Sequence, residues 1–181
     1  MRVFISGGCK NGKSSFAQQL VKEQMSRPLY YIATMKAADG EDSERIVLHR
    51  KEREGMGFNT IEQYKGIEGI LDKSDHRGCF LLDSLTALLV NEMFSPTGDF
   101  DSTACERVST GLMKIMDKLE NIVVVSDYIY GDAELYDPLT ESYRRSLATL
   151  DRLMAQQCDV VLEASYTKII VHKTGVKREI Y

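Results

Sequence analysis

The chain has 181 residues, of which 43% are hydrophobic and 28% charged, and its formal net charge at pH 7 is −4. This composition excludes a disordered chain, and no apolar run approaches the roughly 18 residues that a membrane span needs. The acidic balance argues against a nucleic-acid partner, and the four scattered cysteines indicate free thiols rather than a disulfide scaffold. The N-terminus has no signal-peptide pattern, so we expect a cytoplasmic protein.

Strands and helices alternate in the predicted chain order. Apolar runs predict strands at residues 2–6, 29–33, 58–62, 79–82 and 122–125, and two closing strands, 160–162 and 169–171, that are compatible with a hairpin. Helical patterns begin at residue 13 and recur at 42–53, 67–71, 85–94, 105–119 and 143–154. Strands separated by helices are typical of parallel sheets, because parallel neighbours need crossover connections. We expect one α/β domain over residues 1–181, with a mainly parallel central sheet flanked by helices.

Residues 7–14 form the motif G-x-x-x-x-G-K-S between a predicted strand and a predicted helix. They are Gly7, Gly8, Cys9, Lys10, Asn11, Gly12, Lys13 and Ser14. The glycines let backbone N–H groups converge on phosphate oxygens, and the helix N-terminus adds positive potential. Lys13 can reach the β- and γ-phosphates, and the Ser14 hydroxyl can bind Mg²⁺. The motif predicts an Mg–nucleotide site of the P-loop NTPase type; the alternative is a glycine-rich turn that binds nothing.

A carboxylate follows the buried strand at 79–82. A phosphate-loop site usually needs such a group at the end of a buried strand as a second magnesium ligand, and Asp83 fits this position. The alternative role is helix capping, since Asp83 and Ser84 directly precede the predicted helix at 85–94. The two roles are compatible, and the sequence favours the magnesium role.

The predicted helix at 42–53 carries a basic face. Arg45, His49 and Arg53 are spaced four apart, so they share one side of a helix. Such a face can bind phosphates, and an imidazole can attack an α-phosphate and form a phosphoramidate. A solvated charged helix with an incidental histidine is the alternative, and spacing alone favours that alternative.

Several of these motifs, taken in order, resemble the bifunctional adenosylcobinamide kinase / adenosylcobinamide-phosphate guanylyltransferase family of cobalamin biosynthesis. Besides the phosphate loop, the matching pieces are Tyr31-Ile32-Ala33-Thr34, Arg45-Ile46 with His49-Arg50 and Arg53, Thr60-Ile61-Glu62, and Leu81-Leu82-Asp83-Ser84-Leu85-Thr86 with Asn91 beyond. They cover about the first half of the chain.

The resemblance implies a RecA-like P-loop fold, usually assembled as a homotrimer. It implies that His49 carries GMP covalently, with Lys13 as the other catalytic residue and GTP or ATP, Mg²⁺ and a corrinoid as substrates and cofactor. Kinase and guanylyltransferase reactions on adenosylcobinamide are the implied activities. Besides the phosphate loop, the implied nucleotide contacts are Ala33, Thr34, Met35, Arg50, Lys51, Glu52, Arg53, Glu62 and Asp83.

The second half departs from the family pattern after the strand at 122–125. The family's Asn-Glu pair and its Gly-Ile-Val-Pro turn are absent from residues 126–133. Asp127 could replace the missing Glu as a base or Mg²⁺ ligand, or it could cap the loop. Because acceptors bind at strand-end loops in parallel α/β folds, two alternatives stay open: a divergent nucleotidyl- or phosphotransferase with another acceptor, and a nucleotide-binding regulatory module without transfer activity.

Overall fold

The computed structural model of the chain describes all residues except 24–27, 37–46, 48–49, 52, 167 and 176–181. Its strands are β1 (Arg2–Gly7), β2 (Leu29–Ala33), β3 (Phe58–Glu62), β4 (Cys79–Asp83), β5 (Ile122–Asp127), β6 (Val160–Ser165) and β7 (Lys168–Lys173). The helices are α1 (Lys13–Glu23), α3 (Leu85–Met93), α4 (Ala104–Lys118) and α5 (Pro138–Gln157), with a 3₁₀ helix η1 at Ile67–Lys73. The strands lie in one sheet in the order β3-β2-β4-β5-β1-β6-β7.

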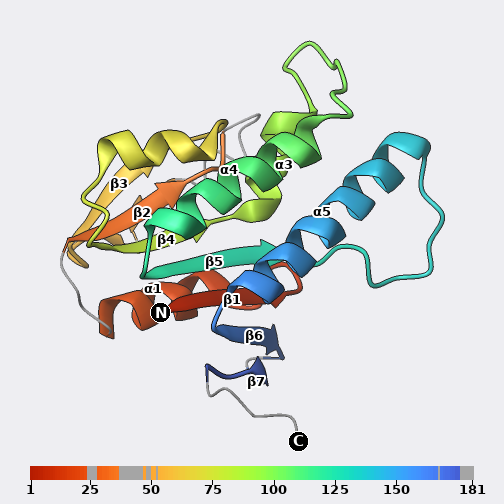
Figure 1. The fold of residues 1–181 in the computed structure, drawn as a ribbon. Helices are drawn as coiled ribbons and strands as arrows, with labels where there is room; N and C mark the ends of the chain where they lie inside the picture. Colours follow the sequence, from red (N-terminus) through yellow and green to blue (C-terminus); the bar gives the residue numbers. More distant parts are fainter. Residues whose placement is uncertain (24–27, 37–46, 48–49, 52, 167, 176–181) are drawn as a thin grey trace, which may run out of the picture.

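The first six strands run parallel, and β7 pairs antiparallel with β6. The predicted mainly parallel sheet and the closing hairpin are therefore confirmed. Helices α4 and α5 lie on one side of the sheet, as Figure 1 shows. No helix in the described part of the chain combines the length and apolar character that crossing a bilayer takes.

Both faces of the sheet are buried, which explains the continuous apolar runs in the sequence. Along β4, Phe80 and Leu82 join the core shared with α3, α4 and α5, whereas Cys79 and Leu81 join the core shared with α1. Because side chains alternate along a strand, Asp83 lies on the same face as Cys79 and Leu81, toward α1.

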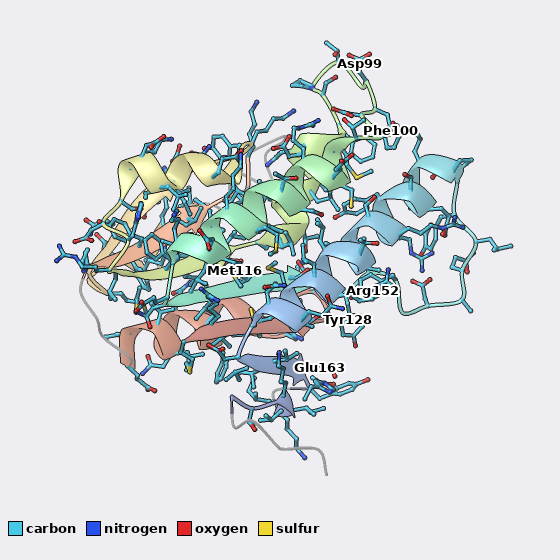
Figure 2. All side chains as sticks on the ribbon, viewed as in Figure 1. Asp99, Phe100, Met116, Tyr128, Arg152 and Glu163 are labelled. Atoms are coloured by element: carbon cyan, nitrogen blue, oxygen red, sulfur yellow. The ribbon has the colours of Figure 1, made fainter. Side chains whose placement is uncertain are left out.

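The segment predicted as a helix at 67–71 is a 3₁₀ helix instead. Its two buried apolar residues, Ile67 and Ile70, are three positions apart. That spacing fits three residues per turn, so these two side chains stack on one side of the tighter helix and face the core. A loop joins α3 to α4, and Asp99 lies at its outer end, beyond these two helices (Figure 2).

The loop between β5 and α5 is tied to α5 by one buried arginine. Figure 2 labels Tyr128, where the chain leaves β5. Further along this loop, Asp132 pairs with Arg144 at 2.7 Å, and Arg144 also donates to the Ile129 carbonyl at 3.1 Å. Glu141, one helical turn earlier, pairs with Arg144 at 2.6 Å. The loop that departs from the family pattern is therefore packed against α5.

One carboxyl, Asp151 of α5, is buried beneath this loop and is 4% exposed. Tyr130 donates a hydrogen bond to its Oδ2 at 2.7 Å, and Oδ1 has no hydrogen-bond partner among the described residues. Burial raises the pKa of Asp151 to about 6, while hydrogen bonding with Ser126 and Tyr130 acts in the opposite direction and nearby Asp127 adds to the rise. The folded protein thus holds this proton at pH values where the unfolded chain releases it.

The raised pKa of Asp151 predicts a pH-dependent change in stability. The stabilisation is complete below the unfolded pKa of about 4 and is lost as the pH rises to about 6, because only the folded state keeps the proton in that window. Asparagine does not titrate, so Asp151→Asn lacks this dependence. The unfolding free energy of the variant minus that of the wild type should therefore increase by about 2–3 kcal/mol between pH 4 and pH 7. Urea unfolding at the two pH values measures the difference, and a difference independent of pH would contradict the assignment.

Candidate active site

The phosphate-loop motif occupies the turn between β1 and α1, as the sequence predicts. Two of its glycines are required by the backbone. A Cβ on Gly7 would overlap the Ala164 carbonyl oxygen and lie 2.6 Å from Asn11 Nδ2, and Gly12 has a φ of +84°, which side chains disfavour. The Asn11 amide donates to the Ala164 carbonyl at the end of β6, and this contact ties the loop to the sheet.

Lys13 lies inside this loop and is almost fully buried. Its Nζ donates to the Gly8 carbonyl at 2.6 Å and to Asn11 Oδ1 at 3.2 Å. It also forms an ion pair with Asp127 Oδ1 at 2.6 Å. The ammonium group is thus held over the loop, where nucleotide phosphates would lie. Ser14 follows on the first turn of α1 and is half-buried, and Cys9 and Lys10 are exposed at the outer side of the loop.

Asp83 ends β4 on the same face of the sheet as α1. Strand β5 separates β4 from β1, so Asp83 lies about 10 Å across the sheet from β1. The Tyr31 hydroxyl donates to Asp83 Oδ2 at 2.7 Å. Burial of Tyr31, together with the adjacent Asp83 carboxylate, raises the pKa of that hydroxyl far above its usual range, so it remains a donor. The hydrogen bond from Tyr31 therefore holds the Asp83 carboxyl in place.

The described residues Arg50, Lys51 and Arg53 form a basic segment, and Arg53 connects it to Asp83 through Tyr31. Its guanidinium carbon lies 3.6 Å from the centroid of the Tyr31 ring, and its side chain is buried. A cation stacked on an aromatic face is attracted by the ring's negative potential. Residues 47, 50, 51 and 53 are helical, in agreement with the predicted helix. Arg45, His49 and Glu52 lie outside the described residues.

The end of β2 supplies a hydrogen-bonded support for the Asp83 turn. The Thr34 hydroxyl donates to the Ser84 carbonyl and accepts from the Ser84 N–H, both at 2.7 Å. Asn91 of α3 donates to the Thr34 carbonyl at 2.7 Å. Ala33 and Met35, the neighbours of Thr34, are half-buried beside it. Ser84 also caps α3 by accepting from the Ala87 N–H at 3.2 Å, so the helix cap falls on Ser84 and leaves the Asp83 carboxylate available.

A pocket of about 900 Å³ lies between the basic segment and β3. Arg50, Lys51, Arg53 and Glu62 line it, as do Gly55, Gly57 and Thr60. Glu62 pairs with Arg50 at 2.6 Å and accepts from the Tyr64 hydroxyl at 2.7 Å. The hydrogen bond from Tyr64, supported by Arg50, lowers the pKa of Glu62. Glu62 therefore stays ionised and can accept hydrogen bonds from a nucleobase or a ribose.

These residues form two groups along the carboxyl edge of the sheet. The phosphate loop, Lys13, Ser14 and Asp83 lie near β1, β5 and β4, whereas Arg50, Lys51 and Glu62 lie near β3 at the far end. Arg53 and Tyr31 link the two groups. Oxygen donors from Ser14 and Asp83 on one face suit Mg²⁺, which otherwise binds water and substrate phosphates. No group of three or more acidic, histidine or cysteine side chains able to hold a metal occurs among the described residues.

Sequence reasoning missed three contacts of this site. Tyr31 lies in an otherwise apolar strand, so the sequence did not predict the hydrogen bond from its hydroxyl to Asp83. The hydroxyl of Thr86 accepts from the Asp127 N–H at 2.8 Å, although the resemblance included Thr86 without a role. The pairing of Lys13 with Asp127 joins residues 114 positions apart, and it becomes visible only when β5 is known to lie beside β1.

Structural comparison defines the class of protein. The flagellar accessory protein FlaH from Methanocaldococcus jannaschii matches with a TM-score of 0.52 at 13% identity, over 99% of this chain and 81% of that chain. The ATPase domain of G40P matches with a TM-score of 0.54 at 13% identity, over 97% of this chain and 77% of that one. With the phosphate loop, the parallel sheet and its helices, these matches confirm a P-loop NTPase fold of the RecA-like type.

Sequence comparison defines the family within that class. The family described as cobinamide kinase / cobinamide phosphate guanyltransferase matches residues 3–166. The bifunctional adenosylcobalamin biosynthesis protein CobP of Pseudomonas aeruginosa is 29% identical over 163 residues, which cover 89% of this chain and 91% of the relative. The CobU protein of Escherichia coli is 29% identical over 102 residues, or 56% of this chain and 55% of the relative. The chain belongs to the cobinamide kinase / cobinamide phosphate guanyltransferase family, a family of enzymes of cobalamin biosynthesis.

Proposed function

We propose that this chain phosphorylates the hydroxyl of adenosylcobinamide with GTP or ATP and then transfers GMP from GTP to the resulting phosphate. Family membership over residues 3–166 supports the pair of activities, and the nucleotide site supports the chemistry. The observation that carries the proposal is the phosphate loop with buried Lys13, placed on the same face of the sheet as Asp83. The family resemblance further leads us to propose a single domain that assembles as a homotrimer.

In the phosphoryl transfer, the protein mainly positions groups and neutralises charge. Backbone N–H groups of the loop and Lys13 would hold the β- and γ-phosphates. Ser14 and Asp83 would hold Mg²⁺, which shields phosphate charge when it is bound. The Tyr31 hydroxyl, 2.7 Å from Asp83, keeps that carboxylate oriented. The acceptor oxygen then bonds to the γ-phosphorus, and the nucleoside diphosphate leaves with the electrons of the broken P–O bond.

In the guanylyl transfer, we propose His49 as the covalent nucleophile. An imidazole nitrogen bonds to the α-phosphorus of GTP, and pyrophosphate leaves. An oxygen of the corrinoid phosphate next bonds to that phosphorus, the P–N bond breaks, and the free histidine returns. Arg50 and Lys51, which follow His49 in the chain and line the pocket beside Glu62, would neutralise the phosphates. Glu62, kept ionised by Tyr64 and Arg50, would accept hydrogen bonds from the guanine.

Product analysis tests the proposed function. The purified protein is incubated with GTP, Mg²⁺ and adenosylcobinamide. The corrinoids are then separated and identified by mass spectrometry. We expect adenosylcobinamide phosphate first and its GDP-activated form later. Unchanged corrinoid would contradict the proposed acceptor. The segment at 126–133, which departs from the family pattern and packs on α5 through Arg144, would then favour another hydroxylated or phosphorylated acceptor.

A further inference from the structure

Asp127 is the carboxylate that lies beside the catalytic lysine. It is the last residue of β5, the strand between β4 and β1, and its Cα is in register with Gly7 at the start of the phosphate loop. Val123 and Val125 of β5 face α1, so Asp127 continues that series onto the α1 face. Its Oδ1 lies 2.6 Å from Lys13 Nζ. The carboxylate thus borders the space where the γ-phosphate of a bound nucleotide would lie.

The backbone of Asp127 is fixed from two sides. Its N–H donates to Thr86 Oγ1 at 2.8 Å, and the N–H of the next residue, Tyr128, donates to the Gly7 carbonyl at 3.3 Å. The side chain is 27% exposed, so solvent or an acceptor molecule can reach it. A carboxylate that is held by its backbone but open at its oxygens can exchange one partner for another without rearrangement of the loop.

Nucleotide binding changes the partner of Lys13. In a phosphate loop of this type the lysine reaches the β- and γ-phosphates. Lys13 Nζ now contacts Asp127 and the Gly8 carbonyl, so its move to the phosphates leaves the Asp127 carboxylate without that partner. Asp83 is in a different situation, since its Oδ2 is bound by the Tyr31 hydroxyl on the other side of β5.

We propose that Asp127 is the general base of the phosphoryl transfer, an inference that rests on the kinase activity in the proposed function. An Asp127 oxygen takes the proton of the acceptor hydroxyl as that oxygen bonds to the γ-phosphorus. The bond from the γ-phosphorus to the bridging oxygen breaks, and its electron pair leaves with the nucleoside diphosphate. The proton passes from Asp127 to solvent after the product departs. Guanylyl transfer needs no such base, because its acceptor is a phosphate oxygen that is already ionised.

The test compares Asp127→Asn with Asp117→Asn. The control removes one negative charge at an exposed residue near the end of α4, whose only ion pair among the described residues is with the neighbouring Lys118. For Asp127→Asn we expect kcat for corrinoid phosphorylation to fall by about 10²–10⁴-fold, the usual contribution of a general base. We expect the KM for nucleotide to stay within about threefold, or to fall, because Lys13 no longer has a competing partner. Asp127→Glu should recover part of the rate, and Asp117→Asn should match the wild type.

Two other roles for Asp127 give different results. If Asp127 only clamps Lys13, then Asp127→Asn weakens nucleotide binding as much as it lowers turnover. If it binds Mg²⁺, raising the Mg²⁺ concentration restores the rate of the variant. Either result overturns the proposal, as does a kcat within about threefold of the wild type. A second readout is the covalent GMP adduct that forms on the protein from GTP labelled at the α-phosphate. This adduct should persist in Asp127→Asn, and its loss would also overturn the proposal.

A corrinoid-free assay separates this proposal from the proposed function. Slow transfer of the γ-phosphate to water needs a base for the attacking water, so hydrolysis should fall in Asp127→Asn as phosphorylation does. If the wild type leaves the corrinoid unchanged, the proposed acceptor is wrong. The role of Asp127 is then decided by hydrolysis alone: a fall of about 10²-fold or more supports it, and an unchanged rate overturns it.

Discussion

Replacement of Lys13 by alanine is expected to lower the rate of corrinoid phosphorylation by about 10³-fold or more. Lys13 is the buried cation of the phosphate loop, and removal of one cation that meets the transferring phosphoryl group has effects of about 10³–10⁵ in comparable sites. We also expect weaker nucleotide binding, because the β-phosphate loses a donor and the Asp127 carboxylate, 2.6 Å from the present Nζ position, then repels the phosphates. Steady-state kinetics and nucleotide titration measure the two effects.

Lys22→Ala is the matched control for this variant. Lys22 lies in the last turn of the same helix and is exposed, so its loss changes the net charge equally without touching the loop. It should have wild-type kinetics. Thermal unfolding of Lys13→Ala checks that the fold persists. A folded Lys13→Ala protein that phosphorylates the corrinoid at a rate near that of the wild type would contradict the assignment of the loop.

Replacement of His49 by alanine is expected to abolish the covalent GMP adduct entirely. A phosphoramidate needs an imidazole nitrogen, and alanine offers no nucleophile. After incubation with α-labelled GTP and Mg²⁺, the wild-type protein should carry label that is labile in acid and stable in base. The corrinoid phosphorylation step should remain, since it uses Lys13, Ser14 and Asp83 near the other end of the sheet edge.

His172→Ala is the control for the adduct. The chain has three histidines, and His172 lies on β7, half-exposed, with Nε2 2.7 Å from Glu163 Oε2. Its variant should be labelled as the wild type is. Label that persists in His49→Ala, or that disappears only in His172→Ala, would place the nucleophile elsewhere and overturn the proposed role of His49.

The sequence was sufficient to predict the fold because its main signals are local. Buried parallel strands produce continuous apolar runs such as 79–82 and 122–125, and the phosphate-loop motif marks the junction of β1 and α1. Strand order is not local. The neighbours of β1 are β5 and β6, more than 100 residues away in the chain, so no spacing rule could place Asp127 beside Lys13.

The candidate site was predictable where a motif fixes a role and unpredictable where a role depends on packing. Asp83 follows from its position after a buried strand. The stack of Arg53 on Tyr31 does not, because an aromatic residue in an apolar strand reads as core and a helical arginine reads as solvated. The family resemblance added Arg50 and Glu62, and in the structure these two side chains are indeed paired. The roles of these residues in nucleotide binding stay predictions.

A chase of the guanylylated protein tests the central claim most directly. The wild-type protein is labelled with α-labelled GTP, freed of nucleotide, and mixed with adenosylcobinamide phosphate. In a single turnover, the label should leave the protein and appear in the GDP-activated corrinoid, with Asp127→Asn behaving as the wild type does. Label that forms on His49 but stays on the protein, or that is released as free GMP at the same rate without the corrinoid, would contradict guanylyl transfer to this acceptor.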